Sequence, residues 1–117
     1  MNLQEIIDTL ELSAYTKPHN YSEIIPSSGY SSDLLSCVMA GAAKKSLWVT
    51  LQSHGNIIAV ASLLDLAAVI ITEGATPDPV MIEKANEENV ILLGTSKPTF
   101  YIIGKLWEMG LRNKQEE

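Results

Sequence analysis

Apolar residues recur along the chain at two spacings, one typical of helices and the other of buried strands. Residues 3–10 place apolar side chains at i, i+3, i+4 and i+7, which predicts a helix with one apolar face. Three short runs rich in Val, Ile and Leu predict core strands at residues 47–51, 68–72 and 90–94. Three longer segments predict helices at residues 57–67, at residues 79–89 and from residues 95–99 to about Gly110. This order predicts a single α/β domain with a mainly parallel sheet and helices on both faces.

The first half of the chain has a less regular pattern. Residues 12–15 and 23–25 are each predicted to form a short strand, the second of them ending at Pro26. The serine-rich residues 27–32 are predicted to form a loop that leads into a helix over residues 34–42. For the helix over residues 34–42, Ser31 or Ser32 is expected to be the N-cap, Asp33 to lie in the first turn and Cys37 to be a small core residue. For the next helix, Asn56 is expected to be the N-cap. Asp65 is expected at an exposed helix position, with a polar contact across an oligomer interface as the alternative.

Composition limits the classes of protein that the chain can belong to. With 117 residues, of which 46% are hydrophobic and 19% charged, we expect one packed domain over residues 1–112 and a charged tail over residues 113–117. The net charge is −6 and the eight Lys and Arg residues are scattered, which argues against binding to nucleic acid. A single cysteine excludes an intrachain disulfide and a cysteine metal cluster.

The sequence also bears on location. The first residues are acidic and lack the basic and apolar regions of a secretory signal. The longest apolar run, residues 57–71, is interrupted by Ser62 and Asp65 and is shorter than the ~20 apolar residues that a membrane span requires. We therefore expect a cytoplasmic protein without a membrane segment.

Polar and small residues follow the predicted strands and indicate a ligand site. The loops at the carboxyl ends of parallel strands share one edge of the sheet, and ligands bind there. Several helix N-termini would point at this edge, which favours a small anionic or phosphorylated ligand. The predicted ligand-binding residues are Gly29, Tyr30, Ser31, Ser53, His54, Asn56, Thr72, Glu73, Gly74, Thr95 and Lys97. For the serines the alternative is helix capping alone, and for His54 it is a structural histidine that binds loop carbonyls.

Catalysis, a metal and a cofactor are not predicted. Ser53, His54 and Glu73 could form a hydrolytic trio, and His54 with Glu73 an acid–base pair. However, adjacent residues such as Ser53 and His54 do not readily come within hydrogen-bond reach of each other. The sequence has no GxSxG elbow, Walker-A loop or GxGxxG, and its two histidines lack the spacing of metal ligands.

The predicted helices over residues 57–66 and 99–109 are apolar on nearly every side. Such a helix has to be covered on every side, and a domain of this size has a limited interior. We therefore expect a homodimer with two-fold symmetry, or else another protein partner.

Three stretches of the chain resemble the stand-alone DRTGG-domain proteins of bacteria and archaea. They are GYSSDLLSCVM at residues 29–39, LWVTLQSHGNIIAVA at residues 47–61 and IITEGATP at residues 70–77. In place of the literal Asp-Arg-Thr-Gly-Gly, residues 27–31 read Ser-Ser-Gly-Tyr-Ser. The resemblance implies a fold similar to the N-terminal domain of HPr kinase/phosphorylase. It also implies a regulatory, ligand-sensing or dimerising module, of the kind found beside CBS pairs.

The expected function is therefore a non-catalytic regulatory module that dimerises and binds a small anionic metabolite or nucleotide. The alternatives are a protein-interaction domain without a small-molecule ligand, and an enzyme that uses His54 and Glu73.

Overall fold

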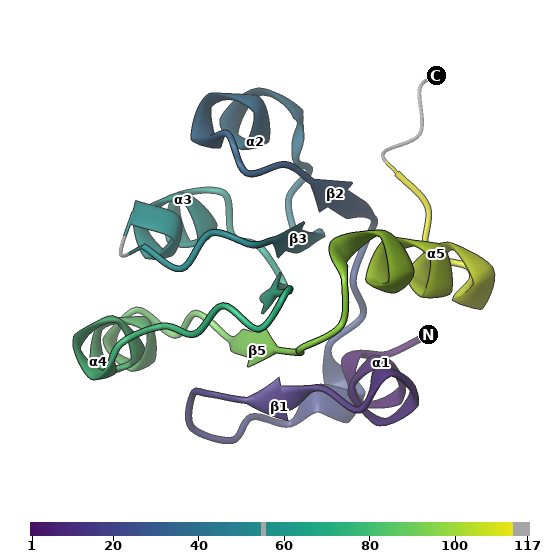
Figure 1. Cartoon of the computed structure of the whole chain (residues 1–117), viewed down its shortest axis with the longest axis horizontal. Helices are drawn as coiled ribbons and strands as arrows, with labels where there is room; N and C mark the ends of the chain where they lie inside the picture. The colour runs from purple at the N-terminus through teal and green to yellow at the C-terminus, as the bar shows by residue number, and fades with distance from the viewer. Residues whose placement is uncertain (55, 114–117) are drawn as a thin grey trace.

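The computed structural model describes residues 1–54 and 56–113 (Figure 1). In chain order its elements are α1 (Leu3–Leu10), β1 (Ser13–Ala14), the 3-10 helix η1 (Tyr21–Glu23), β2 (Gly29–Ser31), α2 (Leu35–Gly41), β3 (Leu47–Thr50), α3 (Asn56–Leu63), β4 (Ala68–Ile71), α4 (Pro79–Glu87), β5 (Leu92–Gly94) and α5 (Thr99–Met109). No helix within the described ranges is long and apolar enough to cross a bilayer.

The strands form one five-stranded sheet in the order β1-β5-β4-β3-β2. The pairs β2·β3, β3·β4 and β4·β5 are parallel, whereas β1 runs antiparallel to β5. Helices α2, α3 and α4 cover one face of the sheet, and α1 and α5 cover the other (Figure 1). The predicted α/β fold with a mainly parallel sheet and helices on both faces is therefore confirmed.

Each face of the sheet has its own apolar core, because successive side chains of a strand point to opposite faces. On β3, Leu47 and Val49 pack with α1 and α5, while Trp48 packs with α2, α3 and α4. All three side chains are at most 2% exposed. This two-sided burial explains why the central strands read as continuous apolar runs.

Two predictions for the first half of the chain are wrong. Residues 23–25 do not form a strand; η1 ends at Glu23, and the Ile24 carbonyl accepts a hydrogen bond from the Leu3 amide at the start of α1. Residues 29–31 are not a loop but the edge strand β2, whose Gly29 is in register with Leu47 of β3. Gly-Tyr-Ser has no apolar alternation of its own, so this strand depends on its partner rather than on a local pattern.

The expected capping of α2 is also wrong. Its N-cap is Leu34, which makes no side-chain capping bond, and Asp33 lies before the helix rather than in its first turn. Ser32 accepts instead from the Leu34 amide, 3.1 Å from Oγ. Cys37, expected in the core, is exposed, because the buried side of this short helix is centred on Val38.

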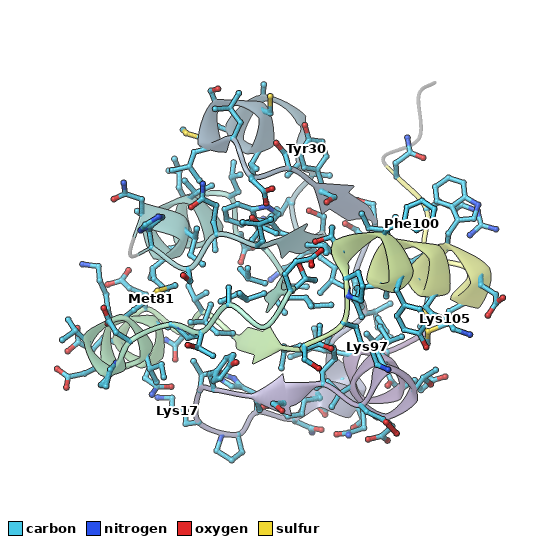
Figure 2. All side chains as sticks on the ribbon, viewed as in Figure 1. Lys17, Tyr30, Met81, Lys97, Phe100 and Lys105 are labelled. Atoms are coloured by element: carbon cyan, nitrogen blue, oxygen red, sulfur yellow. The ribbon has the colours of Figure 1, made fainter. Side chains whose placement is uncertain are left out.

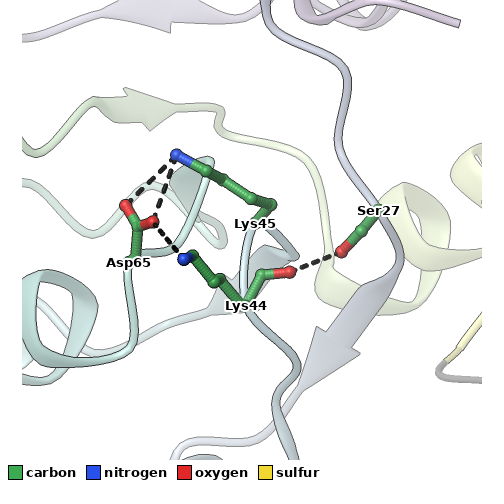
Figure 3. Close-up of polar contacts among 4 residues, drawn as sticks. All are labelled: Ser27, Lys44, Lys45 and Asp65. Atoms are coloured by element: carbon green, nitrogen blue, oxygen red, sulfur yellow. Dashed lines mark hydrogen bonds and ion pairs between the residues drawn. The ribbon is translucent and has the colours of Figure 1, made fainter.

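Helix α3 is shorter than predicted at one end. It begins at Asn56, which is thus its first residue rather than its N-cap, and it ends at Leu63. Asp65 follows the helix in a left-handed conformation with φ of 53°. Its carboxylate lies 3.2 Å from Lys45 Nζ and 3.8 Å from Lys44 Nζ, which are contacts within the chain (Figure 3). These side chains are half exposed or more, so the ion pairs add little stability.

Candidate functional site

The carboxyl ends of β2, β3, β4 and β5 lie at one edge of the sheet. Strand β4 is followed by α4 on one face, and its neighbour β5 is followed by α5 on the other face (Figure 1). Adjacent loops that leave for opposite faces mark the point where open α/β sheets bind ligands. In this chain those loops are residues 72–78 and 95–98.

The two loops at this point are joined to each other by their own backbone. The Glu73 amide donates to the Lys97 carbonyl at 2.9 Å, and the Gly74 amide donates to the Thr95 carbonyl at 3.1 Å. Glu73 and Gly74 both have positive φ, 61° and 75°, which turns the chain toward residues 95–97. The structure thus brings together the five predicted residues of these loops, Thr72, Glu73, Gly74, Thr95 and Lys97, but it closes the space between the loops.

The Glu73 carboxylate binds the start of α5. Its Oε2 accepts a hydrogen bond from the Thr99 amide at 2.7 Å, and Thr99 shares a second hydrogen bond with the buried Thr72 hydroxyl. Amides at a helix N-terminus lack partners within the helix and attract negative charge. Glu73 therefore takes the position that an external anion would occupy at α5, and it is engaged as a cap rather than poised as a base beside His54.

Replacing Glu73 with alanine is expected to lower the free energy of unfolding by about 1 kcal/mol, because the α5 cap is lost. Glu73→Gln is the matched control: it keeps an acceptor oxygen and the same left-handed backbone but removes the charge, so a smaller loss is expected. Urea unfolding followed by circular dichroism measures both. Equal stability of Glu73→Ala and the parent chain would contradict the capping role.

A second carboxylate, Asp33, organises the loop after β3. Its Oδ1 accepts from the Thr50 hydroxyl at 2.7 Å and from the Leu51 amide at 2.9 Å. Gln52 donates from Nε2 to the Asp33 carbonyl at 2.8 Å. These positioning residues were not among the predicted site residues. The signal available in the sequence was Thr50, a polar residue at the end of an apolar strand. In the structure its side chain is completely buried, so its hydroxyl needs a hydrogen-bond partner.

The loop that Asp33 holds leads to the predicted residues Ser53, His54 and Asn56. Ser53 is half-buried, whereas His54 and Asn56 are exposed. Gly55, which lies between them in the sequence, is outside the described residues. The His54 carbonyl accepts from the Ile57 amide at 3.2 Å, so the backbone at His54 is tied to the first turn of α3. That first turn contains no acidic residue. At α4 and α5 the carboxylates come from outside the first turn: Asp78, the N-cap of α4, accepts from the Met81 amide, and Glu73 accepts from the Thr99 amide of α5.

Gly29, Tyr30 and Ser31 lie on β2 rather than in a loop at this edge. The Tyr30 hydroxyl donates to the Cys37 carbonyl at 2.9 Å, and the Ser31 hydroxyl donates to the Val49 carbonyl at 3.0 Å. The Gly29 amide donates to the Arg112 carbonyl at 2.8 Å. Their polar groups thus serve strand and helix contacts, and the prediction that they lie in a ligand-binding loop is wrong in its placement.

No group of His, Cys, Asp and Glu side chains that could hold a metal ion occurs within residues 1–54 and 56–113. At the site itself the carboxylates of Asp33 and Glu73 each accept from backbone amides, and His54 is solvent-exposed. The chemistry that this edge offers is hydrogen bonding from hydroxyl, amide and imidazole groups.

The fold matches that of a solved regulatory region. That structure is the CBS and DRTGG domains of the regulatory region of Clostridium perfringens pyrophosphatase, complexed with the activator diadenosine tetraphosphate. The match has a TM-score of 0.72 and 20% sequence identity over 87% of this chain, and this chain spans 44% of the other. The shared fold is thus that of a DRTGG-like domain.

The family follows from the sequence profile of the HPr Serine kinase N terminus, which matches residues 49–109, more than half of the chain. The chain belongs to this family. The resemblance to DRTGG domains and to the HPr kinase N-terminal domain is therefore confirmed. No curated protein matches the chain.

Proposed function

We propose that this chain is a non-catalytic, cytoplasmic regulatory module that forms a homodimer and binds a small anionic metabolite or nucleotide at the carboxyl edge of its sheet. The observation that carries the proposal is the unequal treatment of the helix starts at this edge. Asp78 and Glu73 already accept hydrogen bonds from amides at the starts of α4 and α5. The first turn of α3 contains no acidic side chain, and Ser53 and the exposed His54 precede it. A ligand's anionic group therefore fits best at residues 53–56.

The remaining predicted residues would form the neighbouring wall. Lys97 is an exposed cation on the loop beside Glu73, and the half-buried Thr95 supplies a hydroxyl on the same loop. Thr72 is buried and bonded to Thr99, so it would support this wall from behind. The Clostridium perfringens regulatory region, which shares this fold, was solved with a dinucleotide activator. That complex supports a nucleotide as the first class of ligand to test on this chain.

The binding proposal predicts a thermal shift with defined probes. Diadenosine tetraphosphate, ATP, AMP and inorganic pyrophosphate are suitable, because they vary the number of phosphates and of bases. Binding at a hundredfold excess over the dissociation constant stabilises the folded state by about 2.7 kcal/mol, which is several degrees in melting temperature for a domain of this size. We expect at least one probe to raise the melting temperature by this order.

Variants decide where a hit binds. His54→Ala should abolish the shift while leaving the melting temperature of the ligand-free chain nearly unchanged, since His54 is exposed. His19→Ala is the matched control, because it removes the other histidine of the chain. A shift that survives His54→Ala would place the ligand elsewhere. If no probe in the panel stabilises the chain, small-anion binding is contradicted.

A second candidate function is a protein-interaction domain, and one observation favours it. Helix α5 exposes large apolar side chains: Phe100 is 90% exposed, Trp107 49% and Tyr101 43%. Exposed apolar side chains gathered on one element mark interaction surfaces. The two functions are compatible, because α5 and α3 pack on opposite faces of the sheet (Figure 1).

A further inference from the structure

Helix α5 has one apolar side that the domain does not cover. Ile102 and Leu106 point into the core, while Phe100, Ile103 and Trp107 lie at i, i+3 and i+7 on another side of the helix. We call these three residues the α5 stripe. Figure 2 shows Phe100 on the side of α5 toward β2, and Lys97 and Lys105 on the side toward α1. Lys97 and Lys105 thus lie away from the stripe, whereas the Arg112 guanidinium lies over the Trp107 ring, 4.5 Å from its centroid, and borders the stripe at that end.

A cavity of about 210 Å³ adjoins the stripe. Its floor is the margin of the sheet at Gly29, Ser31 and Val49, and its wall is formed by Ile103 and Trp107. Gly29 and Ser31 are in register with Leu47 and Val49, so they face the side of the sheet that carries only α1 and α5. The opposite face carries three helices (Figure 1). The cavity therefore lies where this face has small residues and, in the described part of the chain, no helix above β2; Leu111, Arg112 and Asn113, which follow α5, complete its lining.

We infer that α5 of a second copy of this chain occupies this place, with the two α5 stripes packed antiparallel around a two-fold axis. This inference rests on the homodimer of the proposed function and names its interface. Each copy has one uncovered helix side and one uncovered sheet margin beside it. A two-fold arrangement covers both at once, because the same patch meets itself.

The middle of the stripe suits such a pairing. Gly104 lies between Phe100 and Trp107, and a Cβ added there would meet nothing within 4 Å in this copy. A glycine inside a helix is less favourable than alanine by about 1 kcal/mol, and no contact within the domain requires it. With the axis near Gly104 the two helix backbones can approach closely, and Phe100 of each copy comes opposite the partner's Trp107.

Area and charge are consistent with a second copy as the occupant. From their exposed fractions and ordinary side-chain sizes, the stripe residues expose roughly 350–400 Å², about half of the ~800 Å² per partner of a standard interface. The sheet margin and the rim of the cavity are available for the remainder. The charged residues of α5, Lys105 and Glu108, pair with each other on another side of the helix, so the dimer contact buries neither. Arg112, which lies over the Trp107 ring, is the charged residue at the rim of the contact.

The test is the mass of the full chain in solution, by light scattering and sedimentation at micromolar concentration. The parent chain should have the mass of a dimer. Phe100→Glu should raise the dissociation constant at least about thirtyfold, because a buried carboxylate would replace an aromatic anchor. Since Phe100 is 90% exposed, this variant should fold normally, as far-ultraviolet circular dichroism will show. Trp107→Glu should dissociate the dimer as well.

Val80→Glu is the matched control: Val80 is 78% exposed and is the second residue of α4, as Phe100 is of α5. It should leave the dimer intact. A dimer that survives both Phe100→Glu and Trp107→Glu would overturn the α5 interface while leaving dimerisation standing. A monomeric parent chain would overturn the interface and the homodimer together. The thermal shift with nucleotide probes is independent of these outcomes, so failure of ligand binding is recognised separately.

Discussion

Replacing Trp48 with alanine is expected to lower the free energy of unfolding by about 3–5 kcal/mol. Trp48 is completely buried at the centre of β3, in the core under α2, α3 and α4. Its indole Nε1 also donates a hydrogen bond to the Ser32 carbonyl at 2.9 Å, which ties β3 to the segment after β2. A loss of this size is a large part of the 5–15 kcal/mol that holds an ordinary domain folded. Urea unfolding at several wavelengths measures it.

Trp48→Phe separates packing from the hydrogen bond. Phenylalanine keeps most of the apolar contact but cannot donate to Ser32, so a loss of about 1–3 kcal/mol is expected from the unpaired carbonyl and the smaller ring. If Trp48→Ala cost less than Trp48→Phe, or less than about 1 kcal/mol, the central position of this side chain in the core would be refuted.

The second large effect is expected at Gly94, the last residue of β5. A Cβ built there would lie 2.3 Å from Tyr15 Cε2 and 2.6 Å from the Tyr15 hydroxyl oxygen. The tyrosine ring thus rests directly on the glycine backbone. Gly94→Val should destabilise the domain by about 1–3 kcal/mol, because the ring has to leave its position beside β5.

A double-mutant cycle with Tyr15→Ala tests the cause. If the ring is the obstacle, Gly94→Val should cost much less in the Tyr15→Ala chain, and the two substitutions should couple by about 0.5–3 kcal/mol. Thermal and urea unfolding of the four chains provide the values. Strictly additive losses would show that the clash with Tyr15 is not what limits residue 94.

The sequence predicted the central part of this fold well for a physical reason. Strands β3 and β4 are buried on both faces, so nearly every side chain in them has to be apolar. The resulting apolar run can be recognised in the sequence without knowing which strands lie beside it. Helix α1 was equally visible, because its one buried side repeats at the helical period and its N-cap Asn2 forms a capping box with Glu5. Local pattern and tertiary burial coincide in these elements.

The elements that were missed depend on distant partners. Strand β2 is only three residues long, and its conformation follows from pairing with β3. Asp65 is exposed, as predicted, but it is not in the helix, because the chain leaves α3 in a left-handed turn, where the Asp65 carbonyl accepts from the Lys45 amide at 2.8 Å. A contact between residues 20 positions apart leaves no periodic signal in either segment.

In the candidate site, too, some features could be predicted from the sequence and others depend on distant residues. Loop positions at the carboxyl edge could be predicted from strand order, since parallel strands end together. The roles of the individual side chains could not. Glu73 caps Thr99 across 26 residues, and Asp33 binds Leu51 across 18. From the sequence, Glu73 was predicted to bind a ligand and Asp33 to lie in the first turn of a helix. Only the tertiary structure shows that each carboxylate accepts a hydrogen bond from the backbone of a distant segment.

The most direct test of the regulatory, ligand-binding function is a titration of the nitrogen-15-labelled full chain with diadenosine tetraphosphate, followed amide by amide by nuclear magnetic resonance. The proposal predicts saturable shifts centred on residues 52–57, extending to Thr72–Gly74 and Lys97, and their loss in His54→Ala. Shifts centred on Ile103, Trp107 and Arg112, or a spectrum unchanged by this probe and by the other nucleotides of the panel, would contradict it.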